Sequence, residues 1–146
     1  MPSIRPVAES DHQIWLSLFA DYAQFYLVDL PDDAASQAWQ WIHDSDEPFW
    51  CDVAELDGKI VGMTQYQLMH RSLSGEKVCY LSDLYVIPEV RGSGAGRALI
   101  DQVFAFAKSK GISNVRWLTQ DYNYNARKLY DSYGRKSDFI LYSFPV

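Results

Sequence analysis

Residues 83–97 read DLYVIPEVRGSGAGR, and the pattern around them predicts the centre of the fold. Alternating apolar residues predict a strand over Lys77–Ile87, and apolar residues at helical spacing after the glycines predict a helix. Lys110 and Gly111 are typical of the end of such a helix, and Asn114–Thr119 is expected as a short strand. A strand, a turn, a helix and a second strand form a βαβ unit, so we expect these two strands to lie parallel.

The residues before this unit predict an antiparallel meander. Phe49–Leu56, Lys59–Met69 and Lys77–Ile87 each alternate with a period of two. Asp57 and Gly58 separate the first two strands and are a hairpin signal, because a type I′ turn requires positive φ at both positions. A meander joined to one βαβ unit gives a mixed, mostly antiparallel sheet of the α+β class.

The two ends of the chain predict the elements that flank this sheet. Ser3–Val7 is expected as the first strand, and two helices follow it, the second beginning near Pro31. Asn123–Tyr133 is expected as a further helix and Asp138–Phe144 as a final strand. No linker or repeat divides the chain. We therefore expect a single domain over residues 1–146, with about four helices around the sheet.

The composition excludes several classes of protein. Hydrophobic residues make up 48% of the chain, which excludes a disordered protein. The net charge of −6 argues against a nucleic-acid partner, because phosphate binding needs clustered basic residues, and it suits a cationic or neutral small substrate. No signal peptide or apolar run of about 20 residues occurs, so we expect no membrane span and a cytoplasmic location. Cys51 and Cys79 are expected as buried thiols.

The glycine turn is a candidate anion site. Gly92, Gly94 and Gly96 alternate directly after a strand and at the entry to a helix, where main-chain N–H groups and the helix dipole can bind a pyrophosphate. Arg91 and Arg97 flank the turn and add positive charge. The alternative is a tight turn with no ligand, but three alternating glycines between two arginines favour the anion site.

Two other phosphate-binding motifs do not match. A Walker loop requires G-x-x-x-x-G-K-[ST], which does not occur in the chain. A dinucleotide-binding fingerprint requires a sixth-position glycine counted from Gly92, where this chain has Arg97. The anion site is therefore of neither kind.

These residues resemble the acetyl-CoA motif of the GNAT N-acetyltransferase superfamily. The family pattern [QR]-x-x-G-x-[GA] is matched by Arg91, Gly94 and Gly96, and the preceding strand ends in the similar string DLYV. A second family feature, an asparagine-rich helix start followed by a tyrosine, is similar to Asn123–Tyr130. The resemblance covers roughly Leu81–Gly134. Residues 117–120 and 126–131 look most similar to small bacterial members near the polyamine and histone acetyltransferases.

The resemblance implies acetyl-CoA as co-substrate, bound where the two parallel strands splay apart. Main-chain groups of Leu84, Tyr85 and Val86 would bind the pantetheine arm and polarise the thioester carbonyl. Asn125 would contact the coenzyme arm, and Tyr130 would lie beside the sulfur. The pyrophosphate would be held by Arg91, Gly92, Ser93, Gly94, Ala95, Gly96 and Arg97.

Acetyl transfer to an amine also needs a proton donor for the departing thiolate. The resemblance assigns this role to Tyr130, because a phenol with a reference pKa of about 10 is protonated at neutral pH. The alternative is that Tyr130 is a core side chain, since Ala126, Leu129 and Tyr133 share its helical stripe.

The group that accepts the proton of the amine stays open. Many relatives carry an acidic residue at the position of Ser82, and here Asp83 lies beside it. Asp83 is a candidate base, acting through water, and equally a candidate structural hydrogen-bond acceptor. Alternation predicts Tyr80, Ser82, Leu84 and Val86 on one face of the strand and Leu81, Asp83 and Tyr85 on the other.

Other charged and polar residues give weaker signals. Asp29, Asp32 and Asp33 surround the break between the first two helices, where they either attract a cationic acceptor or simply cap a helix and fill solvated turns. The histidines show no metal-ligand spacing, so no metal is expected. They are His12, His43 and His70.

Three functions follow from these patterns. The first is an N-acetyltransferase that acts by direct attack in a ternary complex on a polyamine, a lysine side chain of a peptide or another small amine. The second is a non-catalytic acyl-CoA-binding module, and the third is a phosphate-binding regulatory domain. Tyr130 and the strand Asp83–Val86 favour the first, because anion binding alone does not need them. Homodimers are common in the family, and by analogy the strand Phe139–Phe144 is an edge that can pair.

Overall fold

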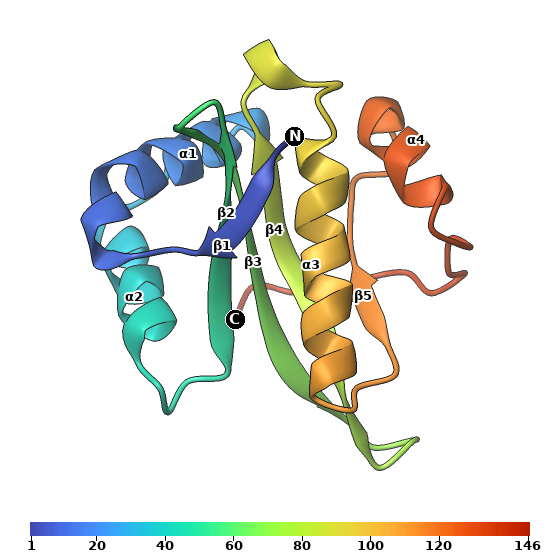
Figure 1. Cartoon of the computed structure of the whole chain (residues 1–146). Helices are drawn as coiled ribbons and strands as arrows, with labels where there is room; N and C mark the ends of the chain where they lie inside the picture. Colours follow the sequence, from blue (N-terminus) through green and yellow to red (C-terminus); the bar gives the residue numbers. More distant parts are fainter.

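The computed structural model describes all 146 residues and contains one five-stranded sheet (Figure 1). The strands follow one another across the sheet in sequence order. They are β1 (Ser3–Pro6), β2 (Phe49–Leu56), β3 (Lys59–Arg71), β4 (Glu76–Val86) and β5 (Val115–Trp117). The first three neighbouring pairs are antiparallel and β4–β5 is parallel. The predicted mixed, mostly antiparallel α+β sheet is confirmed.

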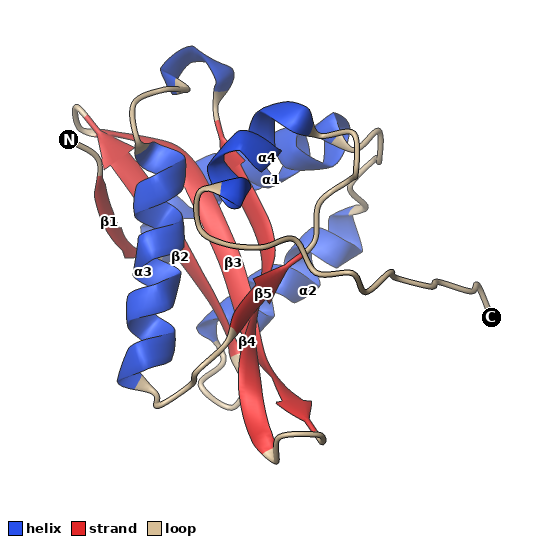
Figure 2. Ribbon diagram, turned by 90° about the vertical axis from the view of Figure 1, so that its right-hand side faces the viewer, coloured by secondary structure: helices blue, strands red, loops and turns tan.

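Four α-helices cover the sheet, as predicted. They are α1 (His12–Phe25), α2 (Asp32–His43), α3 (Ala95–Ser109) and α4 (Tyr124–Asp131), with short 3₁₀ turns at η1 (Glu9–Asp11) and η2 (Pro88–Val90). Figure 2 shows α3 on one face of the sheet and α1 and α2 on the other. None of the helices combines the length and the apolarity that crossing a bilayer requires. That residues 1–146 form a single domain stays a prediction.

Two cores hold the helices to the sheet. On one face, Trp15 and Leu18 of α1 pack against Val53 and Met63, all at most 1% exposed. On the other face, α3 packs its inward stripe, which includes Ile100, against β3 and β4. Apolar residues that recur about every 3.6 positions in the helices therefore pack against apolar residues that recur every two positions in the strands, on both faces of the sheet.

The hairpin between β2 and β3 has the predicted turn. Asp57 and Gly58 have φ values of 54° and 78°, the positive pair that a type I′ turn requires. Glycine adopts such a φ without steric cost, and aspartate is one of the few other residues that tolerate it. This turn joins β2 to β3 as an antiparallel hairpin.

A β-bulge at Ser82 changes the predicted faces of β4. The register pairs Gln65 with Asp83 and the next residue of β3 with Leu81, so Ser82 has no opposite residue. Leu81 consequently packs under α3, on the same face as Leu84. The prediction that Leu81 shares a face with Asp83 is wrong, because the period of two does not reveal an inserted residue.

The predicted final strand, Asp138–Phe144, is absent. Residues 134–146 are all exposed and contain no helix or strand. Their only hydrogen bond is local, from the Phe139 N–H to the Ser137 Oγ at 3.0 Å. A strand needs a neighbour to satisfy its main-chain groups, and the folded chain places none beside this segment.

Candidate active site

β4 and β5 separate halfway along the sheet. Their parallel pairing joins Cys79–Leu81 to Val115–Trp117 and stops there. Beyond the bulge, β4 continues to Val86 with no strand on its outer side. This open edge of β4 is the splay between the two parallel strands that the family resemblance implies.

Main-chain groups of Leu84 and Val86 face the open edge. The N–H of Ile87 donates to the Val61 carbonyl at 2.9 Å, so the main chain of Ile87 faces β3. The direction of the main-chain N–H and C=O groups alternates from one residue to the next along an antiparallel pair. The N–H and C=O groups of Leu84 and Val86 therefore face away from β3. Two consecutive outward positions can therefore bind an extended ligand.

Tyr85 differs from its two neighbours. Its main chain faces β3, opposite Met63, and its ring packs on the α1 face. Arg91 Nε donates to the Val86 carbonyl oxygen at 3.3 Å, which agrees with the outward direction of that carbonyl. The predicted ligand contact through the main chain of Tyr85 is therefore not available in this geometry.

The glycine loop Arg91–Arg97 leads into α3 with unpaired donors. Gly92 and Gly94 have φ values of 87° and 90°, which residues with a Cβ rarely adopt. The N–H groups of Gly92, Gly94, Ala95 and Gly96 donate no hydrogen bond within the chain. They lie at the N-terminus of a 15-residue helix, where the dipole favours an anion.

The two flanking arginines make different contacts. Arg97 donates from Nη2 to Ser132 Oγ at 2.9 Å, and its guanidinium lies 4.9 Å from the ring centre of Tyr133. Arg97 thus holds the end of α4 against α3. Arg91 is exposed and contacts the open edge of β4.

α4 places Tyr130 beside β5. The Tyr130 ring packs edge-on against Trp117, with ring centres 5.6 Å apart. Burial raises the pKa of Tyr130 to about 12, so its hydroxyl stays protonated at neutral pH. Asn125 is exposed in the first turn of α4, while Asn123 donates to Thr119 Oγ1 at 3.0 Å and anchors the start of the helix.

Asp83 lies in a polar network on the α1 face. Gln65 Nε2 donates to Asp83 Oδ2 at 2.8 Å, and Trp15 Nε1 donates to Gln65 Oε1 at 2.9 Å. Burial raises the pKa of Asp83, and the hydrogen bond from Gln65 offsets part of this shift. Ser82 Oγ donates to the Gln65 carbonyl at 3.0 Å, so this hydroxyl stabilises the bulge.

Tyr22 of α1 lies beside Asp83. Its hydroxyl lies 3.4 Å from the Ser82 carbonyl oxygen. Burial raises the pKa of Tyr22, and the nearby Asp83 and Tyr130 raise it further. Tyr22 and Asp83 thus lie together on the α1 face of β4, and Tyr130 lies beside β5, on the other side of the splay.

Sequence reasoning missed Tyr22 and Gln65. Tyr22 is predicted only as part of the apolar stripe of a helix, and nothing in the local sequence separates it from Phe19 or Phe25. Gln65 did give a signal, because it is a polar residue inside a buried strand, and it is 0% exposed. A buried polar side chain needs a partner, which here is Asp83.

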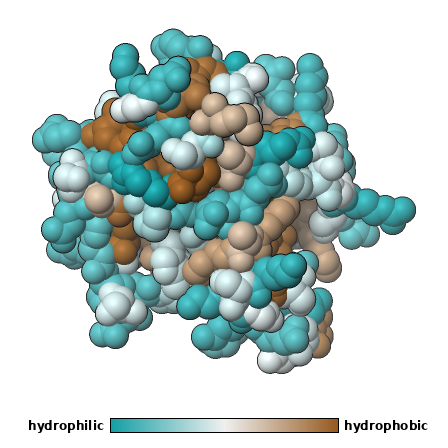
Figure 3. Space-filling view, viewed as in Figure 1, coloured by the Kyte–Doolittle hydropathy of each residue, from teal (hydrophilic) through white to brown (hydrophobic).

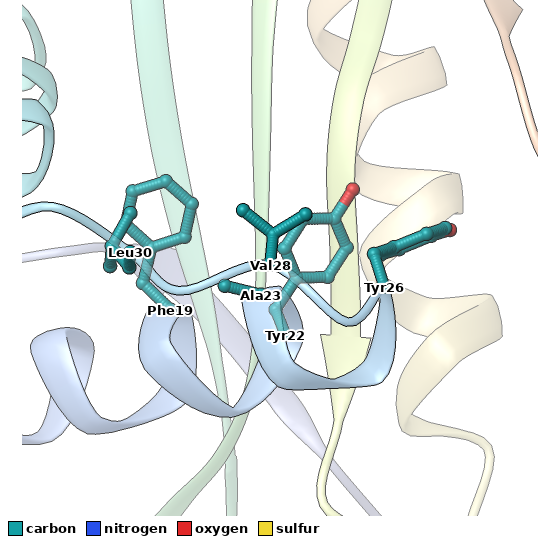
Figure 4. A pocket seen from close by; sticks show the side chains of 6 residues that line it. All are labelled: Phe19, Tyr22, Ala23, Tyr26, Val28 and Leu30. Carbon is teal, nitrogen blue, oxygen red and sulfur yellow. The ribbon is translucent and has the colours of Figure 1, made fainter.

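An apolar hollow opens beside this cluster, between α1 and the loop that follows it (Figure 4). Its volume is about 260 Å³. It is lined by Phe19, Tyr22, Ala23, Tyr26, Val28 and Leu30. In Figure 4 the hydroxyls of Tyr22 and Tyr26 point away from Leu30. The wall is thus apolar at one end and carries two phenols at the other.

A second hollow, of about 370 Å³, connects α1 to the loop before α4. Its lining residues are Phe25, Tyr26, Leu27, Gln120, Tyr122 and Asn123. Tyr26 belongs to both hollows. The end of α1 therefore borders both hollows, and the loop before α4 borders the second.

The acidic residues near α2 make only local contacts. Asp33 accepts from the Ala34 N–H at 3.0 Å, and Asp29 accepts from Gln24 Nε2 at 3.1 Å. Asp32 and Asp33 form the first turn of α2, where negative charge suits the helix dipole. No cluster of histidine, cysteine, aspartate and glutamate could hold a metal ion.

A model of the acetyltransferase (GNAT) family matches residues 15–134. This span runs from α1 through α4 and includes the glycine loop. The chain belongs to the acetyltransferase (GNAT) family. The resemblance seen in the sequence is thereby confirmed.

Named relatives of this GNAT protein are N-acetyltransferases. It is 30% identical over 141 residues to the D-amino-acid N-acetyltransferase HPA3 of Saccharomyces cerevisiae, which covers 95% of this chain and 88% of that protein. It is 30% identical over 140 residues to the thialysine N-epsilon-acetyltransferase of Mus musculus, which covers 90% and 82%. The predicted acetyltransferase activity is confirmed.

Solved structures show the same fold. The structure of AAC(6')-Iy in complex with the bisubstrate analogue CoA-S-monomethyl-acetylneamine matches with a TM-score of 0.85. That comparison covers 100% of this chain and 98% of the other, at 21% identity. It supports the arrangement of the elements and carries no conclusion about the acceptor.

The residues of the glycine loop fit the acetyl-CoA that the GNAT family uses. Ser93 Oγ is buried and has no hydrogen-bond partner in the chain, and it lies between the unpaired N–H groups of Gly92 and Gly94. A buried hydroxyl without a partner is costly unless a ligand satisfies it. A pyrophosphate supplies acceptors for the hydroxyl and for both N–H groups.

Proposed function

We propose that this GNAT protein transfers the acetyl group of acetyl-CoA to a primary amine, by direct attack in a ternary complex. The observation that carries the proposal is the open edge of β4, which lies between the unpaired donors of the glycine loop and the cluster of Asp83, Tyr22 and Tyr130. A thioester bound along this edge meets donors for its carbonyl and titratable groups for proton transfer.

Each part of the site has one task. The glycine loop and Ser93 hold the pyrophosphate, and Asn125 lies at the start of α4, where it can contact the coenzyme arm. The outward main-chain groups of Leu84 and Val86 bind the extended pantetheine arm and donate to the carbonyl oxygen, where negative charge develops. The Tyr130 hydroxyl donates a proton to the departing sulfur.

Asp83 accepts the proton of the amine, directly or through water. A carboxylate with a raised pKa is a stronger base than an ordinary one. Tyr22 lies beside it and keeps its own proton, since burial raises its pKa. Ser82, the other candidate, donates to the main chain and is assigned a structural task.

The acceptor is proposed to be a small amine that carries an apolar group. The hollow beside Tyr22 is lined only by apolar and aromatic residues, which favours an apolar group next to the amine over a long polyamine. Thialysine and D-amino acids are the acceptors named for two relatives. A lysine side chain of a peptide presents a similar terminal amine.

The test is release of free CoA thiol from acetyl-CoA with a panel of amines. The panel contains D-leucine, D-phenylalanine, thialysine, spermidine and a lysine peptide. We expect turnover with at least one small amine, and higher kcat/KM for amines with an apolar group than for spermidine. Turnover with spermidine alone would contradict the acceptor class. No turnover with any amine, although acetyl-CoA raises the Tm, would contradict the proposed reaction.

Asp83→Asn is expected to lower kcat about 100-fold and to leave the protein as stable as the wild type or more so. The activity falls because an amide cannot accept the proton of the amine. The pKa of Asp83 is higher in the folded protein than in the unfolded protein. The contribution of Asp83 to the free energy of unfolding is therefore complete below about pH 4, and it is lost as the pH rises through the pKa of the folded protein. The variant avoids this loss, and asparagine still accepts from Gln65. Measuring kcat and Tm at pH 8 checks both.

Asp52→Asn is the matched control. Asp52 is also a carboxyl whose pKa burial raises, and it accepts one hydrogen bond, from the Tyr66 hydroxyl at 2.8 Å. It lies on β2, two strands away from the open edge of β4. We expect the same effect on Tm and no effect on kcat. Equal losses of kcat in both variants would show that Asp83 acts only through the fold.

Two further properties belong to the proposal. The chain is expected to act in the cytoplasm and to form a homodimer. Size-exclusion chromatography with light scattering measures the assembly.

A further inference from the structure

Gln65 differs from the other polar residues that the fold buries. On the face seen in Figure 3, separate apolar patches lie among hydrophilic residues, as on most protein surfaces. Inside, the buried polar residues are Asp52, Thr64 and Gln65. The side chain of Asp52 bonds to one other side chain, and that of Thr64 bonds to a main-chain carbonyl. Of the three, only Gln65 joins two other side chains, Trp15 and Asp83.

Trp15 fixes the orientation of the Gln65 amide. The indole Nε1–H can only donate, so the Gln65 Oε1 must face it, and this hydrogen bond is 2.9 Å long. The amide nitrogen then faces Asp83, where Nε2 donates to Oδ2 at 2.8 Å. The opposite orientation would set the amide N–H groups against the indole N–H and leave donors without an acceptor. Trp15 and Gln65 are 0% exposed, so bulk water cannot replace either partner.

Packing and register hold both ends of this chain of hydrogen bonds. The ring centre of Trp15 lies 4.8 Å from that of Trp39 and 5.3 Å from that of Phe19. The indole therefore has little freedom to turn. At the other end, the register pairs Gln65 directly with Asp83, so the two side chains lie on the same face of the sheet. The amide is thus held between a fixed donor and a fixed carboxyl group.

The orientation of the amide determines which form of Asp83 is stabilised. An N–H donor stabilises the carboxylate, whereas a carbonyl oxygen in its place would accept from the protonated acid. Asp83 forms no ion pair, so no cation stabilises the carboxylate instead. Burial raises the pKa of Asp83, and of the hydrogen bonds that lower it, that from Gln65 acts most strongly, before those of Tyr22 and Ser82. A reversed amide would therefore favour the protonated acid.

The other titratable groups that face Asp83 stay neutral. They are Tyr22 of α1, Cys51 of β2 and Tyr80 of β4. Burial raises the pKa of each of the three, so none of them ionises between about pH 5 and pH 8. The charge beside Gln65 therefore changes with Asp83 alone.

We infer that Trp15 is a positioning residue for acetyl transfer: it fixes the Gln65 amide with a donor toward Asp83 and so keeps that carboxyl group in its ionised, proton-accepting form. The inference rests on the proposed function, in which Asp83 is the base. Trp15 lies on the far side of the amide from Asp83, so it acts through Gln65 and not by contact with a substrate. A purely structural tryptophan would support α1 without affecting the titration of Asp83.

The first test is the titration of Asp83 in the full chain, followed by carbon-13 NMR of protein labelled at the Cγ of aspartate. Asp83→Asn assigns the signal. Gln65→Met keeps the length of the side chain and removes the donor, and we expect it to raise the pKa of Asp83 by about one unit, a tenfold change in the ionisation constant. We expect Trp15→Phe to raise this pKa by about half as much, because the freed amide then adopts both orientations. In the Gln65→Met background, Trp15→Phe should leave the pKa unchanged.

Trp39→Phe is the matched control. It makes the same substitution in a ring that packs against Trp15 and takes no part in the hydrogen bonds of Gln65. We expect it to lower the Tm, as Trp15→Phe does, and to leave the pKa of Asp83 unchanged. An unchanged pKa in Trp15→Phe, or an equal rise with and without Gln65, would overturn the inference. Gln65→Met leaves Trp15 in the core, so an unchanged pKa in that variant overturns the inference even if Trp15→Phe does not fold.

The second test separates this inference from the proposed function. The dependence of kcat on pH reports the groups that titrate in the ternary complex. We expect its acidic limb to move to higher pH in Gln65→Met and in Trp15→Phe, and to stay in place in Trp39→Phe. If the pKa of Asp83 rises in the NMR titration while the acidic limb does not move, the effect of Trp15 on Asp83 is upheld and the role of Asp83 as the base is overturned.

Discussion

Replacing Gly94 by alanine is expected to weaken acetyl-CoA binding about 100-fold while the protein stays folded. Gly94 has a φ of 90° and is the N-cap of α3. A residue with a Cβ costs about 1–2 kcal/mol in this conformation, so the loop rearranges. Two hydrogen bonds to a charged group, at about 1.5–3 kcal/mol each, then fail, which corresponds to a factor of 100 or more. Isothermal titration calorimetry with CoA measures the loss.

Gly75→Ala is the control for backbone strain. Gly75 has a φ of 67°, and a Cβ added there or at Gly94 would meet no atom within 4 Å. Gly75 lies in the turn at the start of β4, whereas the glycine loop follows the other end of that strand. We expect a similar drop in Tm for both variants and unchanged CoA affinity for Gly75→Ala. If both variants bind CoA like the wild type, the glycine loop does not hold the pyrophosphate.

The fold was predictable wherever one local pattern determines it. The period of two in the meander, the turn at Asp57 and Gly58 and the helical stripe of α3 each act over a few residues, and each is confirmed. The same holds for the glycine loop, because positive φ at Gly92 and Gly94 and unpaired N–H groups at a helix start follow from short-range geometry.

The rest of the site depends on contacts between distant segments. The bulge at Ser82 arises from the pairing of β4 with β3, and it decides which face Leu81 takes and where the main chain of Tyr85 points. Tyr22 and Gln65 reach Asp83 from α1 and β3, so no single window of sequence contains the cluster. A spacing rule cannot find residues that only the folded sheet brings together.

The C-terminal residues 135–146 show a different error, because the sequence predicts a strand there that the structure lacks. Residues 139–144 have the composition of a strand, and the prediction Asp138–Phe144 follows that composition. Composition specifies how much burial a segment needs, but it does not specify which chain provides the neighbour. The strand is absent because the folded chain places no neighbouring edge beside this segment to satisfy its main-chain groups.

Tyr130→Phe is expected to lower kcat at least 100-fold, with little change in the KM for acetyl-CoA. Phenylalanine keeps the ring contact with Trp117 but removes the hydroxyl that donates a proton to the sulfur. A proton donor acts in the transition state, so its loss appears in kcat rather than in binding. Steady-state kinetics with saturating amine measure both constants.

Tyr133→Phe is the matched control on the next turn of the chain. Its hydroxyl donates to Asp101 Oδ1 at 2.8 Å, outside the splay, and burial raises its pKa to about 12, as for Tyr130. We expect Tyr133→Phe to cost about 1 kcal/mol of stability, through the lost hydrogen bond, and to leave kcat unchanged. Because the pKa of Tyr130 is about 12, its hydroxyl stays protonated up to about pH 11. The ratio of wild-type kcat to that of Tyr130→Phe should therefore stay constant between pH 7 and 10. A ratio that falls toward one across this range would mean that the proton comes from a group with a lower pKa, and that Tyr130 only packs against β5.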